Sequence, residues 1–190
     1  MRLICNLFIF TITLFFTVRF FRKDGAWDIA RGKNAFRFFT VQSNVLCAAA
    51  ALLLCVVPSQ RWSWLLKYIG TAAVTVTLLT VFLFLGPAMG YKNLLKGSDL
   101  FMHLVTPLAA IGSFSILEKR GMTFGEALLG VLPVILYGAC YAYKILKAPP
   151  EKAWEDFYGF DKNGRWPVSM AAMFAGAFAV CMGLMALQNI

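Results

Sequence analysis

The one histidine of the sequence, His103, lies in an apolar run from Leu100 to Leu108 and is the first candidate for chemistry. An ionisable side chain inside a membrane-spanning segment costs free energy to bury, so it is a functional hypothesis by default. A neutral imidazole can take a proton from a hydroxyl group and return it later in a reaction. The alternative is a histidine that bonds a neighbouring helix or lies close to lipid headgroups. His103 alone does not separate these two interpretations.

Asp99 precedes His103 by four residues, so both side chains can share one face of a helix. A carboxylate there could fix the tautomer and orientation of the imidazole, as the third member of a hydrolytic triad does. The alternative is a helix cap, because Ser98 or Asp99 stands where a helix start needs a side-chain acceptor. We favour the cap for Asp99, which still leaves it free to make a second contact.

A second polar cluster opens another apolar stretch and contains Thr40, Gln42, Ser43 and Asn44. Thr40 and Asn44 share a helical face by their spacing of four, and Ser43 lies beside that face. Neighbouring polar side chains could hydrogen-bond a substrate carbonyl or a developing oxyanion. The alternative is packing between helices through hydrogen bonds, which small polar residues commonly supply in membranes, and composition alone favours it.

The elements that must position these residues are apolar helices. Of the 190 residues, 60% are hydrophobic and 14% charged, and the mean hydropathy is +0.71. A soluble domain has about a quarter of its residues charged, so lipid must solvate much of this chain. Six stretches are long enough to cross a bilayer, which predicts an all-α bundle of six transmembrane helices in a single domain, residues 1–190. They run approximately over Leu3–Phe21, Phe36–Val57, Tyr68–Gly86, Leu100–Leu117, Ala127–Ile145 and Val168–Leu187.

The distribution of basic residues predicts how the chain is oriented. Thirteen of the 18 Lys and Arg residues lie in or at the edges of the connections after the first, third and fifth spans, with Arg19, Arg37 and Lys144 counted at the edges. Because basic residues accumulate on the cytoplasmic side, these odd-numbered connections are expected in the cytoplasm and both termini outside. The localisation predicted is therefore multi-pass and integral to a membrane, the inner membrane if the cell is bacterial.

This orientation relates the two polar clusters to each other. The second and fourth spans enter the bilayer from the same face and run parallel. If they start near Phe36 and Asp99, then Thr40 and His103 each lie four residues in, at a depth of about 6 Å. The sequence therefore allows Thr40 and His103 to meet.

The same residues carry a resemblance to a known family. The segment Phe39-Thr40-Val41-Gln42-Ser43-Asn44, His103 with Pro107, and the six-helix layout resemble the androgen-induced-gene family of membrane hydrolases. They are more closely similar to a group of small bacterial six-helix membrane proteins related to it. The resemblance implies an intramembrane threonine hydrolase with Thr40 and His103 as its catalytic residues. Its animal members cleave fatty acid esters of hydroxy fatty acids, but they have a different sequence around the threonine.

The chemistry expected from this resemblance is covalent catalysis on a lipid ester. Thr40 would attack the ester carbonyl while His103 takes its proton. Asn44 is the preferred oxyanion stabiliser because it shares the face of Thr40, with Ser43 and Gln42 as further candidates. The expected partners are membrane lipids and a lipid ester substrate. The alternative function is a non-enzymatic multi-pass protein, such as a small transporter or a lipid-binding scaffold.

Several other function classes are disfavoured by the sequence. One histidine excludes a multi-histidine metal or haem site, and no cofactor or metal is expected. The basic residues are dispersed and no soluble binding module is present, so nucleic-acid binding is not expected. Five cysteines lie within apolar stretches without close pairing and are interpreted as packing residues. They are Cys5, Cys47, Cys55, Cys140 and Cys181.

Overall fold

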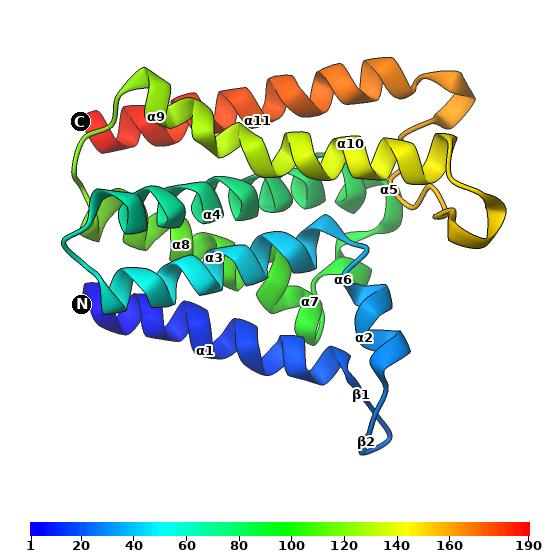
Figure 1. Ribbon diagram of the computed structural model, residues 1–190, viewed down its shortest axis with the longest axis horizontal. Coiled ribbons are helices and arrows are strands. Elements are labelled where there is room, and N and C mark those ends of the chain that lie inside the picture. Colours follow the sequence, from blue (N-terminus) through cyan, green and yellow to red (C-terminus); the bar gives the residue numbers. More distant parts are fainter.

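The computed structural model describes residues 1–190, which form a bundle of long helices lying side by side (Figure 1). Six helices are long and apolar enough to cross a membrane, as expected of a multi-pass membrane protein. The predicted all-α fold is therefore confirmed. The six spans are Arg2–Phe20, Phe39–Val56, Arg61–Met89, Ser98–Leu117, Phe124–Leu146 and Trp166–Asn189.

Several of the spans are built from more than one helical segment, and the segments are named as in Figure 1. The α-helices are α1 (Arg2–Phe20), α2 (Ile29–Ala35), α3 (Phe39–Val56), α4 (Arg61–Thr80), α5 (Gly86–Met89), α6 (Tyr91–Leu94), α7 (Ser98–Leu100), α8 (Thr106–Gly112), α9 (Phe124–Leu128), α10 (Leu132–Leu146) and α11 (Trp166–Asn189). The π-helical turns are η1 (Val81–Leu85), η2 (Phe101–Val105) and η3 (Ser113–Leu117). The 3₁₀ turns are η4 (Leu129–Val131), η5 (Pro150–Lys152) and η6 (Lys162–Gly164). Two short antiparallel strands, β1 (Arg22–Lys23) and β2 (Ala26–Trp27), form a hairpin after α1.

The third span starts earlier than the hydropathy pattern predicts, at Arg61 instead of Tyr68. Its first two turns contain basic residues that the rest of the fold neutralises. Arg61 pairs with Glu126 at 2.6 Å, and Lys67 pairs with Glu118 at 3.5 Å. Because each charge has a partner, the helix continues through residues that a hydropathy scan reads as a connection.

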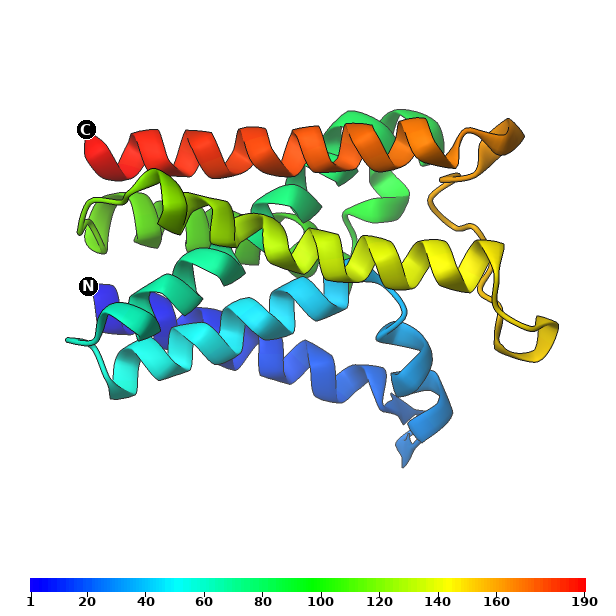
Figure 2. The same ribbon diagram turned by 45° about the horizontal axis from the view of Figure 1, so that its top comes forward.

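Helix α4 is the centre of the bundle. It contacts α3, α8, α10 and α11, while α1 packs against α3 and α8 on one side. Figures 1 and 2 agree that α1 and α11 lie at opposite edges and that both chain ends are at the same end of the bundle. Trp64, Tyr68 and Phe114 form the middle of the largest buried apolar cluster. The central position of α4 fixes how α3 and α8 approach each other.

Helices α3 and α4 pack so closely that Gly70 is needed between them. A Cβ atom at Gly70 would lie 2.6 Å from the Cα of Cys47, which is a backbone atom that cannot rotate away. Small residues allow this kind of backbone approach between membrane helices.

Replacing Gly70 by alanine is expected to lower the free energy of unfolding by about 1–3 kcal/mol, the usual cost of overpacking a dense interior. Thermal unfolding of detergent-solubilised protein, followed by circular dichroism, measures the change. Gly176→Ala is the control, since nothing lies within 4 Å of a Cβ atom there. An unchanged Gly70→Ala variant would contradict the close packing of α3 on α4.

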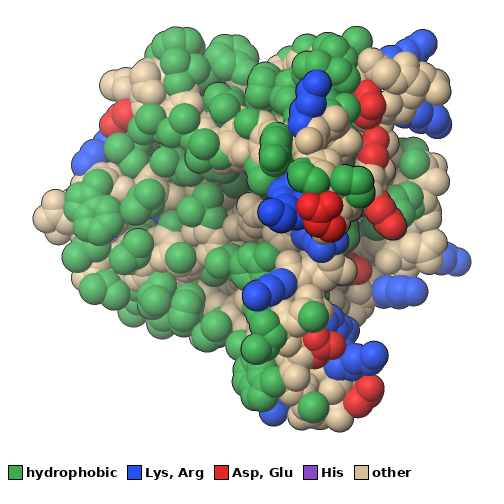
Figure 3. All heavy atoms as spheres, turned by 45° about the vertical axis from the view of Figure 1, so that its right-hand side comes forward, with side chains coloured by type: hydrophobic (Ala, Val, Ile, Leu, Met, Phe, Trp, Pro, Cys, Tyr) green, Lys and Arg blue, Asp and Glu red, His purple; other side chains and the backbone are tan.

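Charged side chains gather at one end of the molecule, over the β1–β2 hairpin, α2 and the connection between α10 and α11 (Figure 3). Apolar side chains predominate along the adjoining helical surface in the same view. This separation fits a membrane span with a polar rim at one interface. The start of α3 and the start of the Ser98–Leu117 helix lie at this charged end (Figure 1).

Candidate active site

The structure brings the two predicted catalytic side chains together. Thr40 is the second residue of α3, and His103 lies in the π-helical turn η2. Thr40 Oγ1 and His103 Nε2 are 3.4 Å apart. Hydrogen bonds of catalytic groups are often long without substrate and tighten when it binds. His103 is 9% exposed and Thr40 is half-buried. The pair is therefore enclosed by the bundle but lies close to its charged end.

The backbone carbonyl of Leu94 determines which nitrogen of His103 carries the proton. His103 Nδ1 is 2.7 Å from the Leu94 carbonyl oxygen, which can only accept a hydrogen bond. Nδ1 is therefore protonated, and the lone pair of Nε2 faces Thr40 Oγ1. In this tautomer the threonine hydroxyl is the donor and the imidazole the acceptor. This is the arrangement that a general base needs to activate a nucleophile.

Local sequence explains where His103 and Leu94 are placed. Pro107 lacks an N–H group, and its ring would clash with the carbonyl of His103 in a regular α-helix. The helix instead widens into η2, in which the Thr106 N–H bonds to the Phe101 carbonyl five residues back. Before this helix, Gly97 has a positive φ of 56°, which lets the chain turn between α6 and α7. The turn carries Leu94 at the end of α6 back against His103.

Asp99 makes neither of the two contacts considered for it, to His103 or as a helix cap. The hydrogen bond at His103 Nδ1 goes to Leu94, and the Asp99 side chain makes no hydrogen bond or ion pair. The residue before α7 is Gly97, and no side chain caps this helix. The orienting group predicted at Asp99 is thus a main-chain carbonyl on the preceding segment.

Asn44 fastens α3 to η2 instead of facing a substrate. Its amide nitrogen donates to the Thr40 carbonyl at 2.8 Å and to the Met102 carbonyl at 2.9 Å. Both amide hydrogens are thereby used, and the side chain is fully buried. The preferred oxyanion donor of the sequence analysis therefore has no free N–H group. Its position fixes the backbone on both sides of the Thr40–His103 contact.

Ser43 and Gln42 are also engaged in bonds within the bundle. The Ser43 hydroxyl lies 3.1 Å from the Thr40 carbonyl and 2.8 Å from the Thr77 hydroxyl on α4. Gln42 Nε2 donates to the Phe36 carbonyl at 2.7 Å. These contacts hold the start of α3 in place: Ser43 contacts the Thr40 backbone itself, and Gln42 bonds the segment just before the helix.

The free donor closest to the threonine hydroxyl is a main-chain group. The first N–H groups of a helix have no partner within the helix. Phe39 N–H donates to the Tyr158 hydroxyl at 3.2 Å, whereas Thr40 N–H has no hydrogen-bond partner in the protein. In serine proteases the N–H of the nucleophile itself forms part of the oxyanion hole. Thr40 N–H is accordingly the strongest oxyanion candidate in this site.

Tyrosines from distant parts of the chain cover the start of α3. Tyr137 on α10 donates to the Arg37 carbonyl at 2.8 Å, and Tyr158 lies in the connection to α11. Burial raises the pKa of Tyr158, so its hydroxyl stays protonated. A phenol that accepts one bond still has its own hydrogen to donate. Tyr158 therefore places a second neutral donor beside the N–H group of Phe39, one residue before Thr40.

No family model, curated protein or solved structure matches this chain. The geometry of the site is therefore what indicates a function. Two of its members, Leu94 and Tyr158, were not found from the sequence. Leu94 acts through its backbone, which leaves no sequence signal. For Tyr158 the available signal was a run of aromatic residues, from Trp154 to Phe160, in a connection outside the spans.

If the Thr40–His103 pair hydrolyses esters, replacing Tyr158 by phenylalanine is expected to slow that reaction about tenfold, the equivalent of one lost hydrogen bond near the reacting atoms. The ring still fills its place in the aromatic cluster, so the protein stays folded. Single-turnover acylation rates with an activated acyl ester measure the effect. Tyr143→Phe removes an exposed hydroxyl that makes no hydrogen bond and should leave the rate unchanged. Equal rates for both variants would remove Tyr158 from the site.

Proposed function

We propose that this protein is an intramembrane hydrolase of lipid esters, with Thr40 as nucleophile and His103 as general base. One observation carries the proposal: the Leu94 carbonyl holds His103 so that the lone pair of Nε2 faces Thr40 Oγ1. Fatty acid esters of hydroxy fatty acids are the substrate class that the family resemblance implies. An ester of this kind would reach the site from the lipid around the bundle.

Acylation follows from the orientation of the two side chains. Thr40 Oγ1 attacks the ester carbonyl carbon while its proton passes to His103 Nε2. The carbonyl oxygen becomes negatively charged and accepts a hydrogen bond from Thr40 N–H, with Tyr158 as a second donor. The tetrahedral intermediate then breaks its bond to the alcohol oxygen. His103 gives the proton to this oxygen, and the acyl group remains on Thr40.

Deacylation requires water at the same place. Thr40 is the second residue of α3, so it lies within about 3 Å, along the axis, of the helix start at the charged end. Water can reach this level of the bundle from the polar rim. Water attacks the acyl carbonyl carbon while His103 Nε2 takes its proton. The bond between the acyl carbon and Thr40 Oγ1 then breaks, His103 returns the proton to Oγ1, and the acid product leaves with its chain in the lipid.

A fluorophosphonate probe with a long alkyl chain tests the proposal. Wild-type protein in detergent is treated with the probe, digested, and the modified residue is found by mass spectrometry. The expected result is one adduct, on Thr40. Thr11 is an exposed threonine within α1 whose hydroxyl bonds to its own helix, and it should stay unmodified as the internal control. An adduct elsewhere, or none in detergent and in lipid bilayers alike, would overturn the proposal.

We also infer that the charged end of the bundle faces the cytoplasm. The support is the excess of Lys and Arg in the connections that lie there. Trp27→Cys on the hairpin, in a chain whose native cysteines are replaced by alanine, provides a label site at this end. In intact cells a membrane-impermeant thiol reagent should fail to reach it. Labelling before lysis would reverse the orientation.

One observation favours a second candidate function, a small transporter. Lys67 and Glu118 form an ion pair in the bundle interior, where ionisable residues often mark an ion or substrate path. This pair lies towards the end opposite Thr40, because α4 begins where α3 ends. A transporter would give no adduct on Thr40, so the probe experiment separates the two functions.

A further inference from the structure

A cavity of about 640 Å³ opens at the charged end, between the end of α1, the hairpin, α2 and the start of the Ser98–Leu117 helix. It is distinct from the Thr40–His103 contact, since neither residue lines it. The two sites are nevertheless joined through η2. Phe101 lines the cavity, and His103 follows two residues later in the same turn.

Three arginines give this cavity a strong positive charge. Arg19, Arg22 and Arg31 line it, and Asp24 is its one acidic residue. None of the three arginines forms an ion pair, because the two ion pairs of the protein are Arg61–Glu126 and Lys67–Glu118. Three guanidinium groups without a carboxylate partner attract an anion, and guanidinium is well suited to bind phosphate or carboxylate.

All three arginines are exposed, and local contacts position Arg22 and Arg31. Arg31 Nη1 donates to the Arg22 carbonyl at 2.6 Å, which fastens α2 to the hairpin. Asp28 caps α2 by accepting from the Arg31 N–H. The Arg22 guanidinium lies 5.4 Å from the centre of the Trp27 ring. These contacts hold the basic groups on one side of the hairpin.

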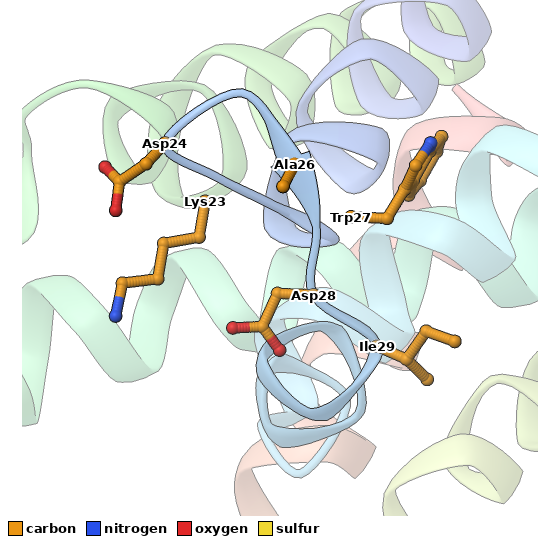
Figure 4. Close-up of a pocket in the computed structure, with 6 residues that line it drawn as sticks. All are labelled: Lys23, Asp24, Ala26, Trp27, Asp28 and Ile29. Carbon is orange, nitrogen blue, oxygen red and sulfur yellow. The ribbon is translucent and has the colours of Figure 1, made fainter.

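The opposite side of the hairpin has a different character. Arg22 and Trp27 are paired across the strands, as are Lys23 and Ala26, so the two pairs point to opposite faces. Figure 4 shows Lys23 and Trp27 projecting in opposite directions, with the carboxylates of Asp24 and Asp28 near the side of Lys23. Lys23 has two carboxylates near it, whereas the cavity has three arginines and the single carboxylate of Asp24, so the excess of positive charge lies at the cavity.

The apolar part of the cavity wall is aromatic, and Gly25, Gly97 and Ser98 complete the lining. Phe16 and Phe20 from α1 face it together with Phe101, and the Phe16 and Phe101 rings are 4.6 Å apart. The exposed side of α1 is apolar, as expected for a surface in lipid. A ligand that satisfies both parts of the cavity has an acid group joined to a hydrocarbon chain.

We propose that this cavity binds an anionic membrane lipid, with its phosphate or carboxylate between Arg19, Arg22 and Arg31 and its chain along Phe16, Phe20 and Phe101. The site lies where α1 leaves the bilayer. A lipid there has its headgroup at the level of the arginines and its chain directed into the bilayer, along the aromatic side chains. This binding does not depend on ester hydrolysis. It would place an anionic lipid next to the helix that carries His103.

Lipid retention measured by native mass spectrometry tests the proposal. Wild-type protein is equilibrated in mixed micelles containing phosphatidylcholine, phosphatidylglycerol and oleate at equal concentrations, then transferred to lipid-free detergent. One anionic lipid per chain should be retained, and the Arg19→Gln/Arg31→Gln variant should retain about tenfold less. Retained phosphatidylglycerol identifies a phosphate ligand, and retained oleate identifies a carboxylate.

The control variant, Lys147→Gln/Arg165→Gln, loses the same charge from exposed positions outside the cavity. It should retain the anionic lipid as wild type does. An equal loss in the control would mean that general surface charge holds the lipid, which overturns the site. Equal retention by Arg19→Gln/Arg31→Gln would overturn it as well. Circular dichroism and gel filtration establish that each variant is folded. The variant Arg19→Lys/Arg31→Lys keeps the charge and should bind more lipid than the glutamine variant.

Discussion

The Thr40→Val variant is expected to lose ester hydrolysis by a factor of at least about 10³, because a methyl group replaces the attacking hydroxyl. Valine keeps the size and branching of threonine. The hydroxyl makes only the 3.4 Å contact with His103, so its removal should leave the fold intact. Hydrolysis of a p-nitrophenyl acyl ester in mixed micelles measures the rate. Formation of the fluorophosphonate adduct should disappear in parallel.

His103→Gln is the companion variant and should lower the rate about 10²- to 10⁴-fold, the usual range for a lost general base. The glutamine amide can still donate to the Leu94 carbonyl, but it cannot take the proton of Thr40. Thr75→Val is the matched control, since it removes a half-buried threonine hydroxyl that bonds to its own helix on α4. A Thr40→Val enzyme as active as Thr75→Val would mean that the nucleophile is another residue.

The features that the sequence predicted well are those that depend only on the order of residues along the chain. Hydropathy located all six spans, because crossing a bilayer demands about twenty apolar residues in a row. Counting spans and residues showed only that Thr40 and His103 could meet. In two parallel helices that start at the same membrane face, residues that are the same number of positions from the start lie at the same depth. The fold then needed only to bring those two helices into contact.

The features that were missed depend on contacts between distant segments. Leu94 orients His103 through a backbone oxygen, which any residue type possesses. Asn44 has the residue type of an oxyanion donor, but its two hydrogens are used by carbonyls on α3 and η2. Tyr158 reaches Phe39 from 119 positions away. Residue type and local spacing cannot reveal any of these three contacts.

The environment of Lys67, which affects the stability of the bundle, also could not be predicted from the sequence. The hydropathy pattern predicts that Lys67 lies in the connection before the third span, where a lysine would be solvated. In the structure it is 0% exposed, and its Nζ lies 3.5 Å from Glu118 Oε2 and 3.0 Å from Ser113 Oγ. Glu118 also accepts a hydrogen bond from Asn6 on α1. The ion pair therefore joins α4, the end of the fourth span and α1.

Replacing Lys67 alone by methionine is expected to lower the free energy of unfolding by about 3–5 kcal/mol, because Glu118 would remain buried without its counter-charge. Methionine keeps an unbranched chain of similar length, so the loss of charge dominates over the loss of volume. Titration of the protein in mixed micelles with a denaturing detergent measures the change. Lys147→Met on the exposed connection after α10 is the control and should unfold as wild type does.

The double variant Lys67→Met/Glu118→Gln separates the cost of an unpaired charge from the value of the pair itself. A neutral glutamine can still accept from Asn6, and methionine fills the space of the lysine chain. Replacing both members of a buried pair is often neutral, so most of the stability lost in Lys67→Met should return. If Lys67→Met unfolded like wild type, the ion pair would contribute nothing to stability, and hydrogen bonds alone would hold the cluster. A double variant as unstable as the single one would instead mean that the pair contributes net free energy to holding α1 and α4 together.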